Sequence, residues 1–180
     1  MKIDFKHLKR QFRLMSIAQK IILIGCVGAI IFAFSPWFEL TSGFGIIEET
    51  EKINGFSRFS IFGIISISFA LASLFLLSRE MISKRKDFLN FANNYLLMFF
   101  SLEAIFALFI AIFVFQSYFR DFSSQFRFGI FLSFISHLAI FLAAYFSFLE
   151  EKKDIARDDF KKMSQNENID INKDQLSLGE

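Results

Sequence analysis

The sequence predicts an all-α fold, an integral membrane bundle of four transmembrane helices with both termini in the cytoplasm. The chain of 180 residues is 54% hydrophobic, and its charged residues gather in a few blocks with long uncharged stretches between them. Helical stretches of about 18–22 residues match a hydrocarbon core about 30 Å thick. Backbone groups in lipid must pair within the protein, so these stretches are expected to be helices rather than open strands.

The charge blocks divide the chain into three parts. Residues 1–20 are a basic amphipathic segment, residues 21–149 hold the transmembrane domain, and residues 150–180 form a charged cytoplasmic tail. After about residue 164 the tail has few large apolar residues, so it is expected to be disordered. The four spans are predicted at about residues 21–38, 59–77, 95–115 and 128–149.

The N-terminal segment repeats apolar residues at helical spacing, at Phe5, Leu8, Phe12 and Met15. Basic residues occupy most of the other side. This pattern is typical of a helix that lies in the membrane interface against anionic lipid. It equally suits a helical lead-in to the first span that carries charge for topology.

The orientation follows from the distribution of Lys and Arg. In chain order, the segments outside the spans carry six, two, four, two and six of these residues. Cytoplasmic loops of membrane proteins are enriched in Lys and Arg. The alternation therefore predicts that both termini and the middle loop are cytoplasmic and that the chain lies in a plasma (inner) membrane as a multi-pass protein.

The first outer loop, residues 39–58, is acidic and contains three glycines that favour turns, at Gly43, Gly45 and Gly55. The residues between these glycines are expected to form a short hairpin.

Two ionisable residues inside predicted spans are the candidate site. Glu103 lies in the third span and His137 in the fourth. A charged side chain at the centre of a membrane helix costs about 2.5–3.5 kcal/mol on insertion scales, so it calls for a partner. Both residues are predicted at similar depth, so an intramembrane Glu103–His137 pair is expected. Such a pair is a polar latch between helices, a proton- or cation-coupled site, or a dimer contact.

Small residues predict the faces on which the helices pack, because they allow close approach of helices in lipid. They recur at helical spacing in every span. The predicted packing residues are Gly25, Ala29, Ala33, Gly63, Ser66, Ala70, Ser73, Ala107, Ala111 and Ser133.

The sequence contains no recognisable catalytic or metal-binding pattern. Its single cysteine, Cys26, excludes an internal disulfide and a cysteine metal cluster. No phosphate-binding loop, metalloprotease helix or nucleophile motif is visible. We therefore expect no enzyme activity, no metal and no cofactor. The net charge of +2 is too small to predict a nucleic-acid partner.

The first predicted span ends in a Pro-Trp pair followed by a glycine-containing loop, SPWFELTSGFG from Ser35 to Gly45. In this layout the chain resembles small four-span bacterial inner-membrane proteins of uncharacterised function. In outline it is also similar to claudin-like tetraspans, but its outer loop lacks their cysteine pair. Small multidrug transporters also have four short spans and a membrane carboxylate, which lies in their first span, whereas Glu103 lies in the third.

These observations favour a small polytopic membrane protein that acts as an assembly, scaffold or accessory subunit. Its surroundings are the lipid bilayer, and its partners are other copies of the chain or a larger membrane complex. The alternative is a small proton- or cation-coupled transporter or channel subunit that uses Glu103 and His137.

Overall fold

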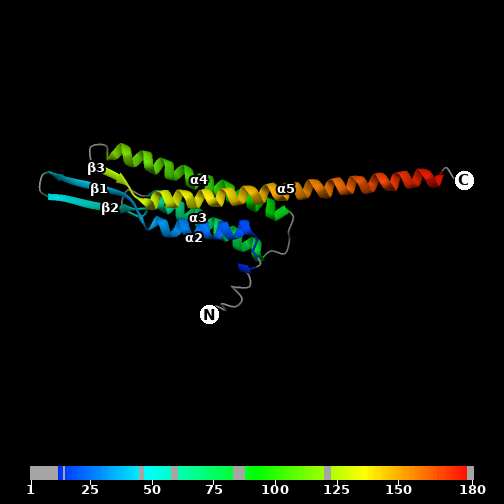
Figure 1. Ribbon diagram of the computed structural model, residues 1–180, viewed down its shortest axis with the longest axis horizontal. Helices are drawn as coiled ribbons and strands as arrows, with labels where there is room; N and C mark the ends of the chain where they lie inside the picture. Colours follow the sequence, from blue (N-terminus) through cyan, green and yellow to red (C-terminus); the bar gives the residue numbers. More distant parts are fainter. Residues whose placement is uncertain are drawn as a thin grey trace, which may run out of the picture.

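The chain folds into a helical bundle with a small sheet at one end and a long helical extension at the other (Figure 1). A computed structural model describes residues 12, 13, 15–44, 47–57, 61–82, 88–119 and 123–177. Within these residues the elements are α2 (Ile17–Ala33), β1 (Pro36–Phe44), β2 (Ile47–Asn54), α3 (Ile61–Ile82), α4 (Phe88–Tyr118), β3 (Ser123–Phe126) and α5 (Phe128–Ser177). Most of the predicted amphipathic segment, including Phe5 and Leu8, lies outside the described residues.

Three of the four helices in the described part of the chain are long and apolar enough to cross a membrane. They contain the apolar stretches Ile61–Arg79, Asn93–Tyr118 and Phe128–Lys161. The helix α2 is also apolar, but it has 17 residues and is shorter than the other three.

Both ends of α2 have a local cause. At its start the Ser16 hydroxyl accepts a hydrogen bond from the Gln19 backbone N–H at 3.2 Å, and the Gln19 side chain accepts one from the Ser16 N–H at 3.0 Å. This reciprocal pair is a capping box. At its end Pro36 disfavours helical backbone in the preceding residue and begins β1. The helix therefore ends at Ala33 rather than at Phe38, where the first predicted span ends.

The three-stranded antiparallel sheet is a departure from the all-α fold that the sequence predicts. Its strand order is β2-β1-β3. A hairpin is present as β1 and β2, with Thr41 opposite Thr50. It is longer than the hairpin expected between the glycines of the outer loop, because its first strand starts at Pro36, inside the first predicted span. The strand β3 comes from the short link before α5 and pairs Phe126 with Phe38. This long-range pairing depends on how the helices bring the two links together, so local sequence patterns do not predict it.

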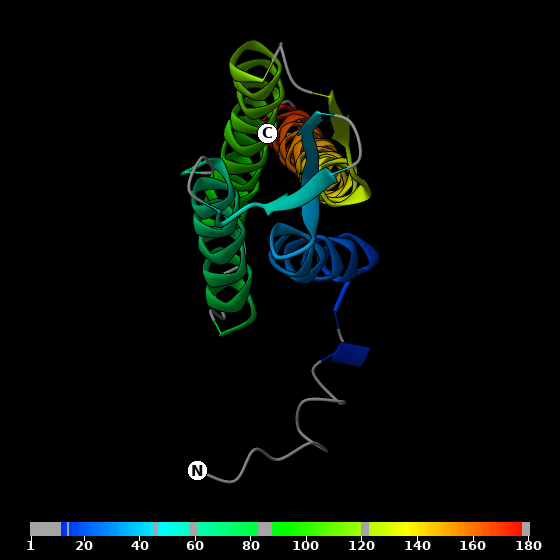
Figure 2. The ribbon, with the colours of Figure 1, turned by 90° about the vertical axis from the view of Figure 1, so that its left-hand side faces the viewer.

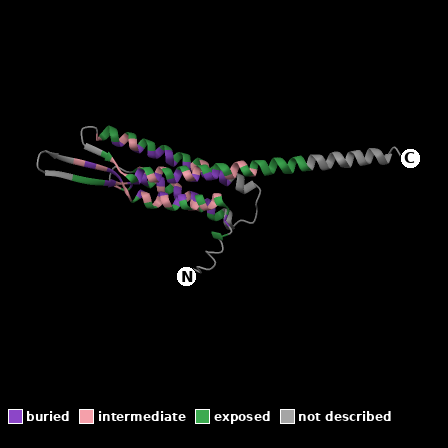
Figure 3. Cartoon of the chain, in the orientation of Figure 1, coloured by how far each residue is buried: buried purple, intermediate pink, exposed green. Residues whose placement is uncertain are grey.

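The four helices form a ring in which each contacts two neighbours. The helix α2 packs on α3 and α5, and α4 packs on the same two helices. Figure 2 looks from the sheet end and shows the strands crossing over this end of the bundle. The described residues on the inner sides of the helices are mostly buried, whereas those on the outer sides are mostly exposed (Figure 3). Because α3 and α5 each lie between α2 and α4 in the ring, they stand diagonally across the bundle from one another.

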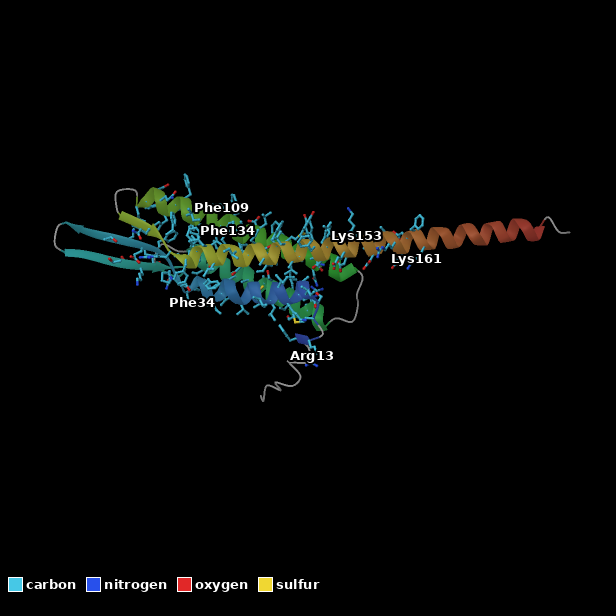
Figure 4. The ribbon with its side chains drawn as sticks, in the orientation of Figure 1. Arg13, Phe34, Phe109, Phe134, Lys153 and Lys161 are labelled. Carbon is cyan, nitrogen blue, oxygen red and sulfur yellow. The ribbon has the colours of Figure 1, made fainter. Side chains whose placement is uncertain are left out.

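The core at the sheet end is built around Trp37, which is fully buried. Its indole Nε1 donates a hydrogen bond to the Phe32 carbonyl at 2.9 Å. The Phe38 ring stacks on Phe115 of α4 with centroids 3.7 Å apart. On the outside of the bundle, Phe109 of α4 and Phe134 of α5 meet edge to face at 5.2 Å (Figure 4). The aromatic residues thus attach the sheet to the helices and the helices to one another.

The helix α5 is 50 residues long and extends far beyond the bundle (Figure 1). The expectation of disorder after residue 164 differs from this structure, in which helix continues to Ser177. From residue 130 to residue 177 the sequence has neither Gly nor Pro, so no residue in this stretch breaks the helix that the apolar segment begins. Lys153 and Lys161 lie on the projecting part (Figure 4).

Candidate functional site

A hydrogen bond between Ser66 and His137 lies in the centre of the bundle. The Ser66 Oγ and the His137 Nε2 are 2.8 Å apart, and the two residues are 0% and 1% exposed. Ser66 comes from α3 and His137 from α5, so the bond joins the diagonal pair of helices. A polar contact in an apolar interior ties two helices together at one register, because a shift of either helix would leave both groups unpaired.

One further polar group extends this centre along α5. Ser133 lies one turn before His137 and is fully buried. Among the described residues, its Oγ is a buried side-chain atom without a hydrogen-bond partner. Ser136, next to His137, donates instead to the Leu132 carbonyl of its own helix at 2.8 Å. The centre of the bundle therefore combines one paired imidazole with one unpaired hydroxyl.

Glu103 and His137 are not brought together. Glu103 is exposed on α4, and His137 bonds to Ser66 instead. Within the described part of the chain, no hydrogen bond or ion pair joins the expected partners.

The reason is the pitch of the helix. Four-residue spacing predicts Glu103 on the same face as Ala107 and Ala111, which are 8% and 4% exposed. Four residues of an α-helix turn about 40° more than one full turn. Glu103 and Ala111, which are eight residues apart, therefore point about 80° away from each other around the helix. Ala104, the next residue along, is fully buried and occupies the inner face that was expected for Glu103.

All ten residues that were predicted to lie on packing faces are buried. Gly25 shows how close the helices come, because a Cβ at this position would lie 2.7 Å from Ile140 Cγ1 and 2.9 Å from the Ser136 carbonyl of α5. Ser66 belongs to the same set, and it has the additional role of bonding to His137. These ten buried residues are Gly25, Ala29, Ala33, Gly63, Ser66, Ala70, Ser73, Ala107, Ala111 and Ser133.

An ion pair between Glu39 and Arg127 links the sheet to the start of α5. Arg127 Nη2 lies 2.6 Å from Glu39 Oε1, and Arg127 Nε donates to Oε2 at 2.7 Å. The side-chain hydrogen bond from Arg127 lowers the pKa of Glu39 below its ordinary value of 4.5, and Glu39 in turn raises the pKa of Arg127. The sequence indicated only that both residues lie in loops on the same side, so this pairing was missed.

The opposite end of the bundle has its own polar contact. The side-chain amide of Asn94, on α4, donates to Glu151 Oε2 at 3.0 Å and to Ser147 Oγ at 3.3 Å, both on α5. Asn94 is 3% exposed. The sequence shows only that a polar residue, Asn94, lies at the end of a predicted span, so its hydrogen bonds to α5 could not be predicted.

A cavity of about 190 Å³ lies between the sheet and the ends of α3 and α4. Its walls include Phe38 and Ile53 from the strands, Phe62 from α3, and Ala111, Val114 and Tyr118 from α4. Sequence analysis did not predict it, because it depends on how the sheet covers the gap between two helices.

The described residues contain no group of three His, Cys, Asp or Glu side chains that could hold a metal ion. Cys26 is buried as a free thiol in the apolar core. No protein-family model and no curated protein matches the chain.

Proposed function

We propose that this protein is a four-span membrane protein that works by assembling within the bilayer with further copies of itself or with a larger membrane complex. The observation that supports this proposal is the position of Glu103. It is the only charged residue of the apolar stretch Asn93–Tyr118, and it lies on an exposed face of the helix.

The surroundings of Glu103 are apolar. Leu102, Phe106 and Phe99 on the same helix are 53%, 62% and 49% exposed. In the described part of the chain no hydrogen bond or ion pair is formed by Glu103. In a single copy this carboxyl would face hydrocarbon, at a cost of about 2.5–3.5 kcal/mol for a charged group at the centre of a helix. A hydrogen-bonding group from another membrane helix removes that cost, so the carboxyl favours association.

The projecting part of α5 supports the same proposal from the other end of the molecule. Every residue from 152 to 161 is exposed, including Ile155 at 49% and Phe160 at 74%. A long helix that leaves its own bundle has surface available for a partner. The projecting part of α5 and the exposed face of α4 around Glu103 are therefore two separate regions that can contact a partner.

The membrane topology is part of the proposal. The Lys and Arg pattern supports four spans with cytoplasmic termini in an inner membrane. As a helix of 17 residues, α2 covers about 26 Å at 1.5 Å per residue. Phe34, Trp37 and Phe38 extend the apolar length beyond its end, and non-helical backbone is tolerated there because the sheet pairs it. The transport alternative has less support, since Glu103 and His137 do not form a joint site.

The test is the mass of the assembly formed by the full chain, measured by native mass spectrometry in mild detergent and by subunit counting in vesicles. Glu103→Leu is expected to lower the assembled fraction at least tenfold. Glu103→Gln retains part of it, because an amide still forms hydrogen bonds. Phe106→Leu is the control on the same exposed face and is expected to leave the assembly unchanged. Equal assembly by wild type and Glu103→Leu would refute the proposal.

A further inference from the structure

We infer that the cavity beneath the sheet binds an alkyl chain of a membrane lipid. The cavity has a volume of about 190 Å³. An apolar cavity of about 150 Å³ in another protein stays dry and accepts benzene. This cavity is therefore large enough for a bulky apolar group or for a section of a lipid chain.

The described residues that line the cavity are predominantly apolar. Phe38 and Ile53 form the sheet side and are 4% and 3% exposed. Phe62 from α3 and Ala111 from α4 form the helical sides. None of the described lining residues is charged, and Tyr118 contributes the one hydroxyl. A charged or strongly polar ligand would lose its hydration here without gaining partners.

The cavity reaches the molecular surface between α3 and α4. Tyr118 lines the cavity and is 74% exposed, whereas the ring of Phe115 at the deep side is 5% exposed and stacks on Phe38. Val114 and Phe62 are half-buried, as expected for residues at a mouth. An extended chain can therefore enter from the side of the bundle and end against the sheet.

The position of the mouth identifies the occupant. It lies at the sheet end of two helices that are apolar enough to span a membrane. Ile61, Ile64 and Phe113 on the outside of these helices are 65%, 53% and 71% exposed, so their surroundings are hydrocarbon when the chain is embedded. Alkyl chains are then the apolar molecules present at high concentration. The Tyr118 hydroxyl at the mouth suits the polar end of a lipid, since tyrosine favours the membrane interface.

This inference requires that the helices lie in a membrane, but it does not require the assembly through Glu103. The probe is a phosphatidylcholine with a diazirine near the glycerol end of one acyl chain, in vesicles that contain the full-length protein. After irradiation, labelled peptides are mapped by mass spectrometry. Labelling of Val114 and Tyr118 is expected to exceed labelling of Phe106 and Phe113, which are exposed controls on α4 away from the cavity.

Two variants fill the cavity and test whether the label reports on it. Ala111→Phe is expected to lower labelling of Val114 and Tyr118 at least threefold while labelling of Phe106 stays constant. Val114→Phe is the second variant, for use if Ala111→Phe does not fold. It fills the mouth from a half-buried position and is expected to lower labelling of Tyr118 in the same way. Labelling of Tyr118 that equals the controls and is unchanged in both variants would overturn the inference.

Two other outcomes would also overturn it, for different reasons. If a second copy of the chain fills the cavity, labelling of Tyr118 rises when the protein is diluted tenfold in lipid, whereas a bound lipid chain predicts no change. If neither Phe113 nor Tyr118 is labelled at all, this end of α4 is not in contact with lipid, and the membrane embedding fails together with the inference. The assembly measurement with Glu103→Leu is independent of each of these results.

Discussion

The Ser66 hydroxyl lies 2.8 Å from Nε2 of His137, and this hydrogen bond joins two helices that stand diagonally across the bundle. Helices that are neighbours in the ring are held by packed small residues along their length. The diagonal pair has little direct contact besides side chains that reach across the centre. A single polar bond there relates the register of α3 to that of α5.

We expect Ser66→Ala to lower the free energy of unfolding by about 1–3 kcal/mol, because it leaves a buried imidazole nitrogen unpaired. The measurement is thermal unfolding of the full chain in detergent, followed by circular dichroism. Ser68→Ala is the matched control, since Ser68 is exposed on the same helix and bonds to the Ile64 carbonyl of its own helix. It should change stability by less than about 0.5 kcal/mol. Equal effects of the two variants would show that the bond to His137 contributes nothing.

The ion pair between Glu39 and Arg127 predicts a dependence of stability on pH. Because the folded state lowers the pKa of Glu39 below its ordinary value of 4.5, folding favours the ionised carboxylate. The stabilisation is fully present above pH 4.5 and is lost as the pH falls through the lower pKa of the folded state. The difference in Tm between wild type and Glu39→Gln should therefore be largest above pH 4.5 and shrink below it.

Glu51→Gln is the control for this titration, since Glu51 is an exposed carboxyl on β2. Its Tm difference from wild type is expected to be smaller than that of Glu39→Gln at neutral pH. A Glu39→Gln difference that stays constant from pH 7 to pH 3 would be inconsistent with the ion pair.

The same substitution is predicted to have different effects on stability at two glycines. A Cβ at Gly63 would overlap the backbone carbonyl of Gly55, so Gly63→Ala forces α3 away from the turn after β2. We expect it to destabilise the protein by about 1–3 kcal/mol, the usual range for overpacking. At Gly28 the nearest atom is the Ser136 Oγ at 2.8 Å, and this side chain can rotate.

For Gly28→Ala the gain in helix propensity, up to about 1 kcal/mol, offsets the contact with Ser136. The two variants are compared by thermal unfolding in the same detergent. A Gly63→Ala variant as stable as Gly28→Ala would mean that the backbones of residues 55 and 63 are farther apart than the structure places them.

The number of spans predicts where the ends of the chain lie. With four spans, tags at Met1 and Glu180 report from the same side of the membrane. If α2, with its 17 residues, did not cross, the three longer helices would place the two tags on opposite sides. Protease protection of tagged protein in sealed membrane vesicles distinguishes these cases. We expect both tags on the cytoplasmic side, as the Lys and Arg pattern indicates.

Much of the secondary structure depends on local patterns that are visible in the sequence. Long apolar runs predict helices because backbone groups must pair where water is absent. The structure has a helix in each of the four runs, although the first helix ends at Ala33 rather than at Phe38. Turn residues of the first outer loop predict a hairpin there, but the observed hairpin is longer and begins at Pro36, before these glycines. The capping box at Ser16 and the break at Pro36 are also local effects.

The sequence by itself determined where the apolar helices lie and which small residues could face one another, because these follow from composition and helical period. Only the tertiary structure decided the third strand, the ion pair between Glu39 and Arg127, and the exchange of Glu103 for Ser66 as the contact of His137. The physical reason is that each of these depends on the rotation of one helix, or the placement of one loop, relative to another. For Glu103, the turn of about 40° that separates it from Ala107 is enough to leave its carboxyl on the exposed surface of the bundle while Ala107 is buried.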